Sequence, residues 1–149
     1  MRLTSLDEVL RFAIRKEADE AVFYQMAAGR AKPGVKKTFE ELAREEEGHK
    51  KRLEGFDMKK IDQIELKETR GLGIAETVED VPFDAGMSYA DLLRMAIKSE
   101  EKARQLYTTT AQRVSDSGLK KLLLILAQEE EGHKERLEKI YDEDILKEF

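Results

Sequence analysis

Residues 45–50 read EEEGHK, and residues 129–134 read EEEGHK again. Each copy contains one of the two histidines of the chain, His49 or His133, three residues after a glutamate. Residues three apart lie on the same face of an α-helix, so each copy presents a carboxylate and an imidazole side by side. The motif therefore predicts two helices that each carry half of a metal-binding site.

The two copies belong to a longer internal repeat. Residues 5–30 align with residues 88–113, and this alignment pairs Glu17 with Glu100. After the next turn the correspondence continues through the EEEGHK motifs. A repeat of this length indicates a duplicated structural unit.

Each unit is predicted to form a pair of helices. Ser5 and Ser88 begin patterns typical of a capped helix start, and the Pro-Gly pair at 33–34 and the Ser-Gly pair at 117–118 mark a tight turn within each unit. Each unit is therefore a helical hairpin.

The hairpins are expected at about residues 5–56 and 88–141, with a crossover at about 57–87. A connection of that length can run along a whole helix pair. The 149 residues suit one domain, and the composition of 40% hydrophobic and 40% charged residues suits amphipathic helices. The sequence predicts an all-α fold, a four-helix bundle of two duplicated hairpins joined by a long crossover, in a single domain of residues 1–149.

Helical periodicity also predicts which polar side chains face inward. An apolar stripe through Glu45 would continue to Arg52, whereas a stripe through Glu46 continues to Leu53, so Glu46 is the inward residue of its run. The same test selects Glu130 and assigns the other glutamates of the two runs, Glu45, Glu47, Glu129 and Glu131, to a solvated acidic surface. The inward-facing polar residues are Glu17, Glu20, Glu46, His49, Glu100, Glu130 and His133.

A salt-bridge network is the simplest alternative for these inward groups. It fails on charge balance, because two imidazolium groups cannot compensate the four carboxylates of Glu17, Glu46, Glu100 and Glu130, and no inward Lys or Arg is available. An uncompensated buried charge costs several kcal/mol. Two divalent cations would cancel the four carboxylates, so the pattern predicts a dinuclear metal centre.

One glutamate from each of two helices and a Glu-x-x-His pair from each of two others form the ligand set of the ferritin-like dinuclear carboxylate proteins. Within that superfamily the sequence most resembles the rubrerythrins, whose two hairpins look alike. The resemblance covers nearly the whole chain outside the crossover. It implies six metal ligands, which are Glu17, Glu46, His49, Glu100, Glu130 and His133.

The sequence departs from the usual rubrerythrin pattern in two ways. It contains no cysteine, so it lacks the four-cysteine rubredoxin domain and any internal iron–sulfur relay. The additional inward glutamate expected one turn after Glu100 is replaced by Ala103, whereas the equivalent place in the first hairpin contains Glu20. Glu20 is therefore a further candidate ligand, with a place beside the ligands or on the surface as the alternative.

Two more recurring pairs accompany the motif. Tyr24 and Tyr107 lie two turns beyond the first ligand of each hairpin, where a phenol could orient a ligand carboxylate, although core packing explains them almost as well. Gly48 and Gly132 each cost about 1 kcal/mol relative to alanine within a helix. Their recurrence predicts a close approach by a neighbouring group.

The resemblance implies a pair of iron ions, and the same ligands also suit Mn or Zn. Two Fe(II) supply the two electrons that reduce H2O2 to water. The leading hypothesis is a di-iron oxidoreductase that reduces hydrogen peroxide with an external electron donor such as a separate rubredoxin. The alternatives are a ferroxidase or iron storage or delivery protein that uses O2, and a metal-stabilised binding module without turnover.

The remaining expectations concern partners and location. A net charge of −5 disfavours nucleic acid and anionic membranes, and no apolar run suits a signal peptide or membrane span, so a cytoplasmic protein is expected. The absence of asparagine and the abundance of Glu and Lys are typical of hyperthermophile proteins. A homodimer is expected, and the two similar hairpins would permit domain swapping.

Overall fold

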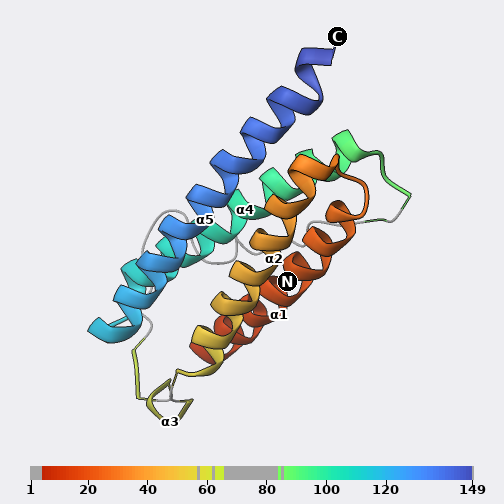
Figure 1. The fold of residues 1–149 in the computed structure, drawn as a ribbon. Coiled ribbons are helices and arrows are strands. Elements are labelled where there is room, and N and C mark those ends of the chain that lie inside the picture. The colour runs from red at the N-terminus through yellow and green to blue at the C-terminus, as the bar shows by residue number, and fades with distance from the viewer. Residues whose placement is uncertain (1–4, 57, 62, 66–83, 85, 149) are drawn as a thin grey trace.

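The computed structural model describes residues 5–56, 58–61, 63–65, 84 and 86–148, and it is all-α (Figure 1). The elements are α1 (Leu6–Ala28), α2 (Pro33–Glu54), α3 (Met58–Ile61), α4 (Tyr89–Arg113), α5 (Ser117–Asp144) and the 3-10 helix η2 (Leu146–Glu148). Helices α1 and α2 form one hairpin and α4 and α5 form the other, and the hairpins meet through α1 with α4 and α2 with α5. The predicted bundle of two hairpins is confirmed.

Both hairpins begin with the predicted serine cap. The Ser5 hydroxyl accepts a hydrogen bond from the Glu8 amide at 3.2 Å, and the Ser88 hydroxyl accepts one from the Asp91 amide at 3.1 Å. These bonds satisfy amide groups that have no partner within the first helical turn. The repeat therefore fixes the same starting point in both hairpins.

The second helix of each hairpin begins at the first residue of the pair that was predicted to form the turn. Pro33 is the first residue of α2, where its missing amide hydrogen is tolerated. Helix α5 begins at Ser117, and the side chain of Asp116 accepts a hydrogen bond from the Leu119 amide at 2.8 Å. The pairs at 33–34 and 117–118 thus lie inside helices, and the turns precede them.

The described part of the predicted crossover contains one element that the sequence did not indicate, the single-turn helix α3. Beyond it, the Ser115 amide donates to the Glu65 carbonyl at 3.3 Å, and the Glu65 amide donates to the Ser115 hydroxyl at 3.2 Å. These bonds attach the start of the crossover to the turn between α4 and α5. Residues 66–83 of the predicted crossover lie outside the described residues.

The apolar core is divided into two clusters. One cluster includes Leu10 and Leu53, and the other includes Phe39 and Leu137. Between them lies a layer of buried glutamates and histidines. Most of the predicted inward stripes are fully buried, so helical periodicity identified the core faces correctly.

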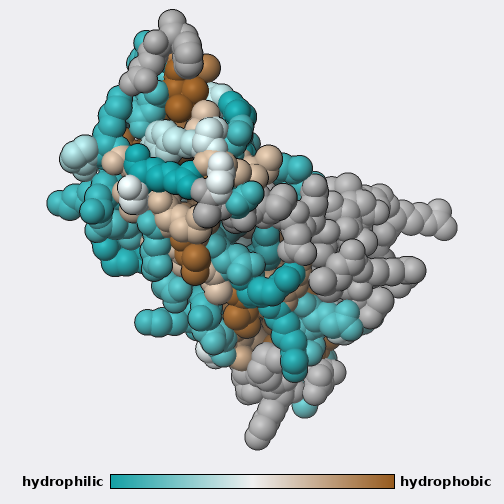
Figure 2. All heavy atoms as spheres, turned by 90° about the vertical axis from the view of Figure 1, so that its right-hand side faces the viewer, coloured by the Kyte–Doolittle hydropathy of each residue, from teal (hydrophilic) through white to brown (hydrophobic). Residues whose placement is uncertain are grey.

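Hydrophilic side chains predominate on the face shown in Figure 2, where the hydrophobic side chains form small separate patches. This agrees with amphipathic helices that turn their charged sides outward. Within the described residues, none of the helices combines the length and the apolar character that crossing a membrane requires.

Candidate metal centre

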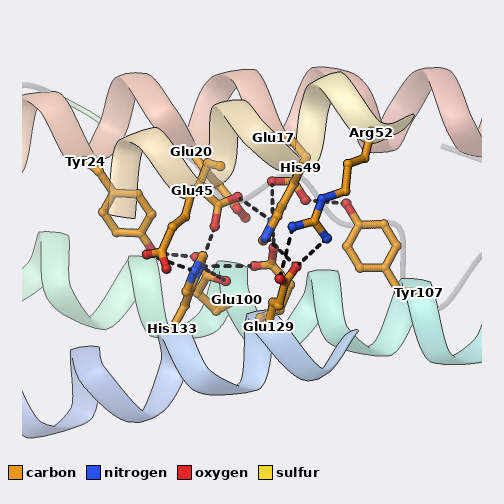
Figure 3. A network of polar contacts seen from close by, with 12 residues as sticks. Glu17, Glu20, Tyr24, Glu45, His49, Arg52, Glu100, Tyr107, Glu129 and His133 are labelled. Carbon is orange, nitrogen blue, oxygen red and sulfur yellow. Dashed lines mark hydrogen bonds and ion pairs between the residues drawn. The ribbon is translucent and has the colours of Figure 1, made fainter. Parts of the chain in front are cut away.

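All four long helices contribute side chains to the polar layer between the two core clusters (Figure 3). Each of the six predicted ligands is buried, with at most 4% of its surface exposed. The glutamates of α1 and α4 face the Glu-x-x-His pairs of α2 and α5. The six residues are Glu17, Glu46, His49, Glu100, Glu130 and His133.

The six side chains form two groups of four potential ligands. In each group, one donor atom from each residue lies within 4.8 Å of the others. Glu46 and Glu130 belong to both groups and can therefore connect two metal positions. The first group is Glu17, Glu46, His49 and Glu130, and the second is Glu46, Glu100, Glu130 and His133.

Both histidines direct the same ring nitrogen into the cluster. His49 Nδ1 lies 2.8 Å from Glu130 Oε1, and His133 Nδ1 lies 2.5 Å from Glu46 Oε1. The two rings are nearly parallel, with centroids 5.4 Å apart. Each imidazole therefore meets a shared carboxylate that belongs to the other hairpin.

The carboxylates have more acceptor atoms than the described residues can satisfy. Among those residues, five buried oxygens make no hydrogen bond with a donor other than the two histidine Nδ1 atoms, which lie 2.5–3.9 Å from them. These oxygens belong to Glu17, Glu46, Glu100 and Glu130. Unpartnered buried polar groups are rare and costly. Four carboxylates and two imidazoles are a ligand set that suits Fe, Mn or Zn, so these residues fit a dinuclear metal centre.

The pKa values show how strongly the cluster resists holding its full negative charge. Burial raises the pKa of Glu46 well above its ordinary value, and the neighbouring charge of Glu100 raises it further. Burial also acts to raise the pKa of Glu17, but its interactions with Glu46 and His49 outweigh burial, and the pKa is lowered. Burial acts to lower the pKa of His49, but its interaction with Glu17 outweighs burial and raises it. Metal binding would displace the protons that remain.

A profile of the rubrerythrin family matches residues 8–81 and 91–148. The chain belongs to the rubrerythrin family. Among solved structures, it is similar to a proposed ferritin-like diiron-carboxylate protein from Thermotoga maritima, with 21% sequence identity and a TM-score of 0.78 over 97% of this chain and 99% of that one. This likeness supports the ferritin-like fold. The comparison with curated proteins gave no match.

Two tyrosines flank the centre of this rubrerythrin-family chain (Figure 3). Tyr24 donates a hydrogen bond to Glu100, and Tyr107 donates one to Glu17. Burial raises the pKa of both phenols well above the ordinary value, so both remain protonated donors. The predicted bonds to ligand carboxylates are present, and each reaches the opposite hairpin.

Glu20 is buried beside the six residues, with 2% of its surface exposed. Its Oε1 accepts a hydrogen bond from the Ser99 hydroxyl at 2.6 Å, and its Oε2 has no hydrogen-bond partner among the described residues. The surface alternative for Glu20 is therefore wrong. Glu20 belongs to neither group of four donors, and its role as a ligand stays a prediction.

Sequence reasoning missed a carboxylate behind each histidine. Glu129, which was assigned to a solvated surface, lies with its Oε2 2.9 Å from the outward nitrogen of His49. Arg52 donates to both oxygens of the same carboxylate, at 3.1 and 3.2 Å. A carboxylate on the far nitrogen of a metal-binding histidine fixes the ring and makes it more basic.

The other hairpin repeats this arrangement more loosely. Glu45 Oε2 lies 3.6 Å from the outward nitrogen of His133, and Arg136 donates to Glu45 at 2.8 Å. The signal in the sequence was an arginine that recurs seven residues after each of these glutamates, at positions 52 and 136. The solvated-surface assignment of Glu45 and Glu129 is therefore incomplete, because both also contact a buried histidine.

Proposed function

We propose that this chain is a non-haem di-iron oxidoreductase that reduces hydrogen peroxide to water with electrons from an external donor. The observation that supports it most directly is the pair of four-donor groups that share Glu46 and Glu130. Two bound Fe(II) would supply the two electrons that the reduction of one H2O2 requires, and metals about 3.5–4 Å apart suit a two-oxygen substrate. Mn or Zn could occupy the same donors without this function.

The protein side chains provide position and exclusion of water. Tyr24 and Tyr107 hold one carboxylate of each group from the opposite hairpin, so that Glu100 and Glu17 keep a fixed orientation. Glu129 does the same for His49. The burial of all these ligands restricts the centre to small reactants and strengthens electrostatic interactions there.

We propose that the electrons reach the centre from an external donor. The chain contains no cysteine, so it holds neither a rubredoxin-type iron site nor an iron–sulfur cluster of its own. A separate rubredoxin is the donor that we propose, and we propose that the working unit is a homodimer.

Stopped-flow oxidation tests this proposal. The anaerobic protein, loaded with two Fe(II) per chain, is mixed separately with equimolar H2O2 and with O2. We expect much faster oxidation by H2O2, and sustained consumption of peroxide once a reduced rubredoxin is added. Faster oxidation by O2 would overturn the peroxidase assignment in favour of a ferroxidase, and a lack of oxidation by either would refute a redox role.

Matched variants connect the reaction to the site. Glu46→Gln removes a shared carboxylate, whereas Glu47→Gln changes the partly exposed neighbour. We expect the first variant to lose rapid oxidation by H2O2 and the second to retain it. Equal rates in the two variants would contradict the assignment of Glu46.

A further inference from the structure

A groove between α2 and α5 leads to the outer edge of the candidate metal centre. Its volume is about 400 Å³, and both histidines line it together with the two Arg–Glu pairs behind them. Two other surface cavities, of about 490 and 480 Å³, are lined by no candidate ligand. Of these three cavities, the groove is the one that reaches the centre.

The histidines are also where the centre comes nearest to solvent. His49 and His133 are 2% and 4% exposed, whereas each of the four candidate carboxylates is at most 1% exposed. Tyr24 and Tyr107, which are both 1% exposed, flank the cluster and donate hydrogen bonds to the glutamates of α4 and α1. The two imidazoles are therefore the thinnest layer of protein between the groove and the buried carboxylates.

Gly48 and Gly132 line the same groove, one on each side. A methyl group placed on either residue would meet nothing within 4 Å among the described residues. The predicted close approach by a neighbour is therefore wrong. Each glycine costs about 1 kcal/mol of helix stability relative to alanine, and helix packing gives no reason for that cost.

The charges around the groove are balanced. Arg52 pairs with Glu129 and Arg136 pairs with Glu45, so two cations face two anions across the opening. A neutral rim of this kind does not concentrate ions of one sign. Selection at the groove therefore acts on size.

We propose that metal ions and small neutral oxidants reach the buried centre through the groove between α2 and α5, and that Gly48 and Gly132 keep this passage open. The proposal rests on the metal-binding part of the proposed function and does not depend on the oxidant. It gives the two glycines a role at the site. It also predicts that the passage discriminates against bulky hydroperoxides.

Uptake of Co(II) by the metal-free protein tests the passage without any redox step. Gly132→Leu is the first variant. Gly132 lines the groove but not the cavity between α1 and α2, whereas Gly48 lines both. The double variant Gly48→Leu/Gly132→Leu should take up Co(II) about tenfold more slowly, which corresponds to an added barrier of about 1.4 kcal/mol. Both should still bind two Co(II) per chain at equilibrium.

Gly34→Leu is the matched control, because Gly34 lies in α2, faces open space and does not line the groove. It should take up Co(II) at the rate of the unchanged protein. The double alanine variant at 48 and 132 guards against misfolding, since each added methyl group enters open space. We expect it to have a higher melting temperature and about twofold to threefold slower uptake.

Three results would overturn the passage. One is unchanged Co(II) uptake in the folded leucine variants, which would place the route elsewhere. Another is a lower melting temperature in the alanine variant, which would show that the glycines are needed for packing. A third is equal slowing in Gly34→Leu. If the peroxide experiment fails but Co(II) uptake is slowed in the leucine variants, the peroxidase chemistry is refuted and the passage stands.

Discussion

Replacement of the shared carboxylate Glu46 by glutamine should stabilise the metal-free protein while it weakens metal binding. Glu46 is completely buried, and its donor atom lies within 4.8 Å of those of Glu100 and Glu130. Two carboxylates at that separation repel by about 3.5 kcal/mol at an effective dielectric constant of about 20. An ionised Glu46 therefore destabilises the fold when metal is absent.

Protonation relieves the repulsion at a similar cost. The ordinary pKa of the group is 4.5, so protonating it at about pH 7.5 costs about 4 kcal/mol, at 1.36 kcal/mol per pH unit. Glutamine has nearly the same shape and is neutral without a bound proton. After allowance for imperfect hydrogen bonds of the new amide, we expect Glu46→Gln to stabilise the metal-free protein by about 2–3 kcal/mol.

Thermal unfolding followed by circular dichroism measures this effect. For a chain of this size, about 2–3 kcal/mol corresponds to a rise in melting temperature of roughly 5–10 °C. With two equivalents of Co(II), the order should reverse, because the variant lacks a shared ligand and gains less from metal. Glu47→Gln should change neither value by more than about 0.5 kcal/mol. A metal-free Glu46→Gln protein that melts below the unchanged protein would refute the reasoning.

Three further perturbations are predicted. Glu129→Gln should weaken Co(II) affinity by about tenfold to a hundredfold in a chelator competition, because it replaces the carboxylate that orients His49 by a neutral amide. An unchanged affinity would show that the contact is incidental. The metal-free protein should lose stability in thermal melts as the pH rises above 4.5, because burial raises the pKa values of Glu20 and Glu46 in the folded state and these groups must then release their protons. Rising pH should instead strengthen metal binding. A stability that rises with pH in both the metal-free and the metal-bound protein would contradict this. Tyr107→Phe should lower the free energy of unfolding in denaturant by about 1.5–3 kcal/mol, because the buried carboxylate of Glu17 loses a donor. The partly exposed hydroxyl of Tyr141 accepts from an arginine, and Tyr141→Phe should lower it by less than about 0.5 kcal/mol. Equal costs would refute the special role of the buried bond.

The sequence was sufficient for the fold and for the inward residues because two simple rules applied twice. The internal repeat defined the hairpins, and the helical period separated Glu46 from its two glutamate neighbours. Ser5 and Ser88 marked the hairpin starts because a hydroxyl can satisfy a free amide locally. These features depend on contacts within a few residues of each other.

What the sequence did not predict depends on contacts between hairpins. Periodicity assigns a side chain to the inside or the outside, but Glu129 lies at the margin, where it contacts both solvent and His49. The space beside Gly132 depends on the distance between α2 and α5, and helical periodicity does not predict that distance. The bonds of the tyrosines to the opposite hairpin were hidden for the same reason.

The contacts at the centre run from one hairpin to the other. Each hairpin supplies one shared carboxylate, and each contributes a tyrosine and a histidine that bond to glutamates of its counterpart. An isolated hairpin therefore contains three of the four donors of one metal position and only one donor of the other. Two identical hairpins about a twofold axis would supply all six ligands, and in this sense the chain is a pair of subunits fused into one.

Fusion frees the two halves to diverge. Position 20 is a buried glutamate, whereas the equivalent position of the second hairpin is Ala103. Ser99 donates a hydrogen bond to Glu20, and the position equivalent to Ser99 in the first hairpin is Lys16. Separate identical hairpins could build only two equal metal positions. A single chain can surround them differently, and the buried carboxylate of Glu20 gives this centre a built-in asymmetry.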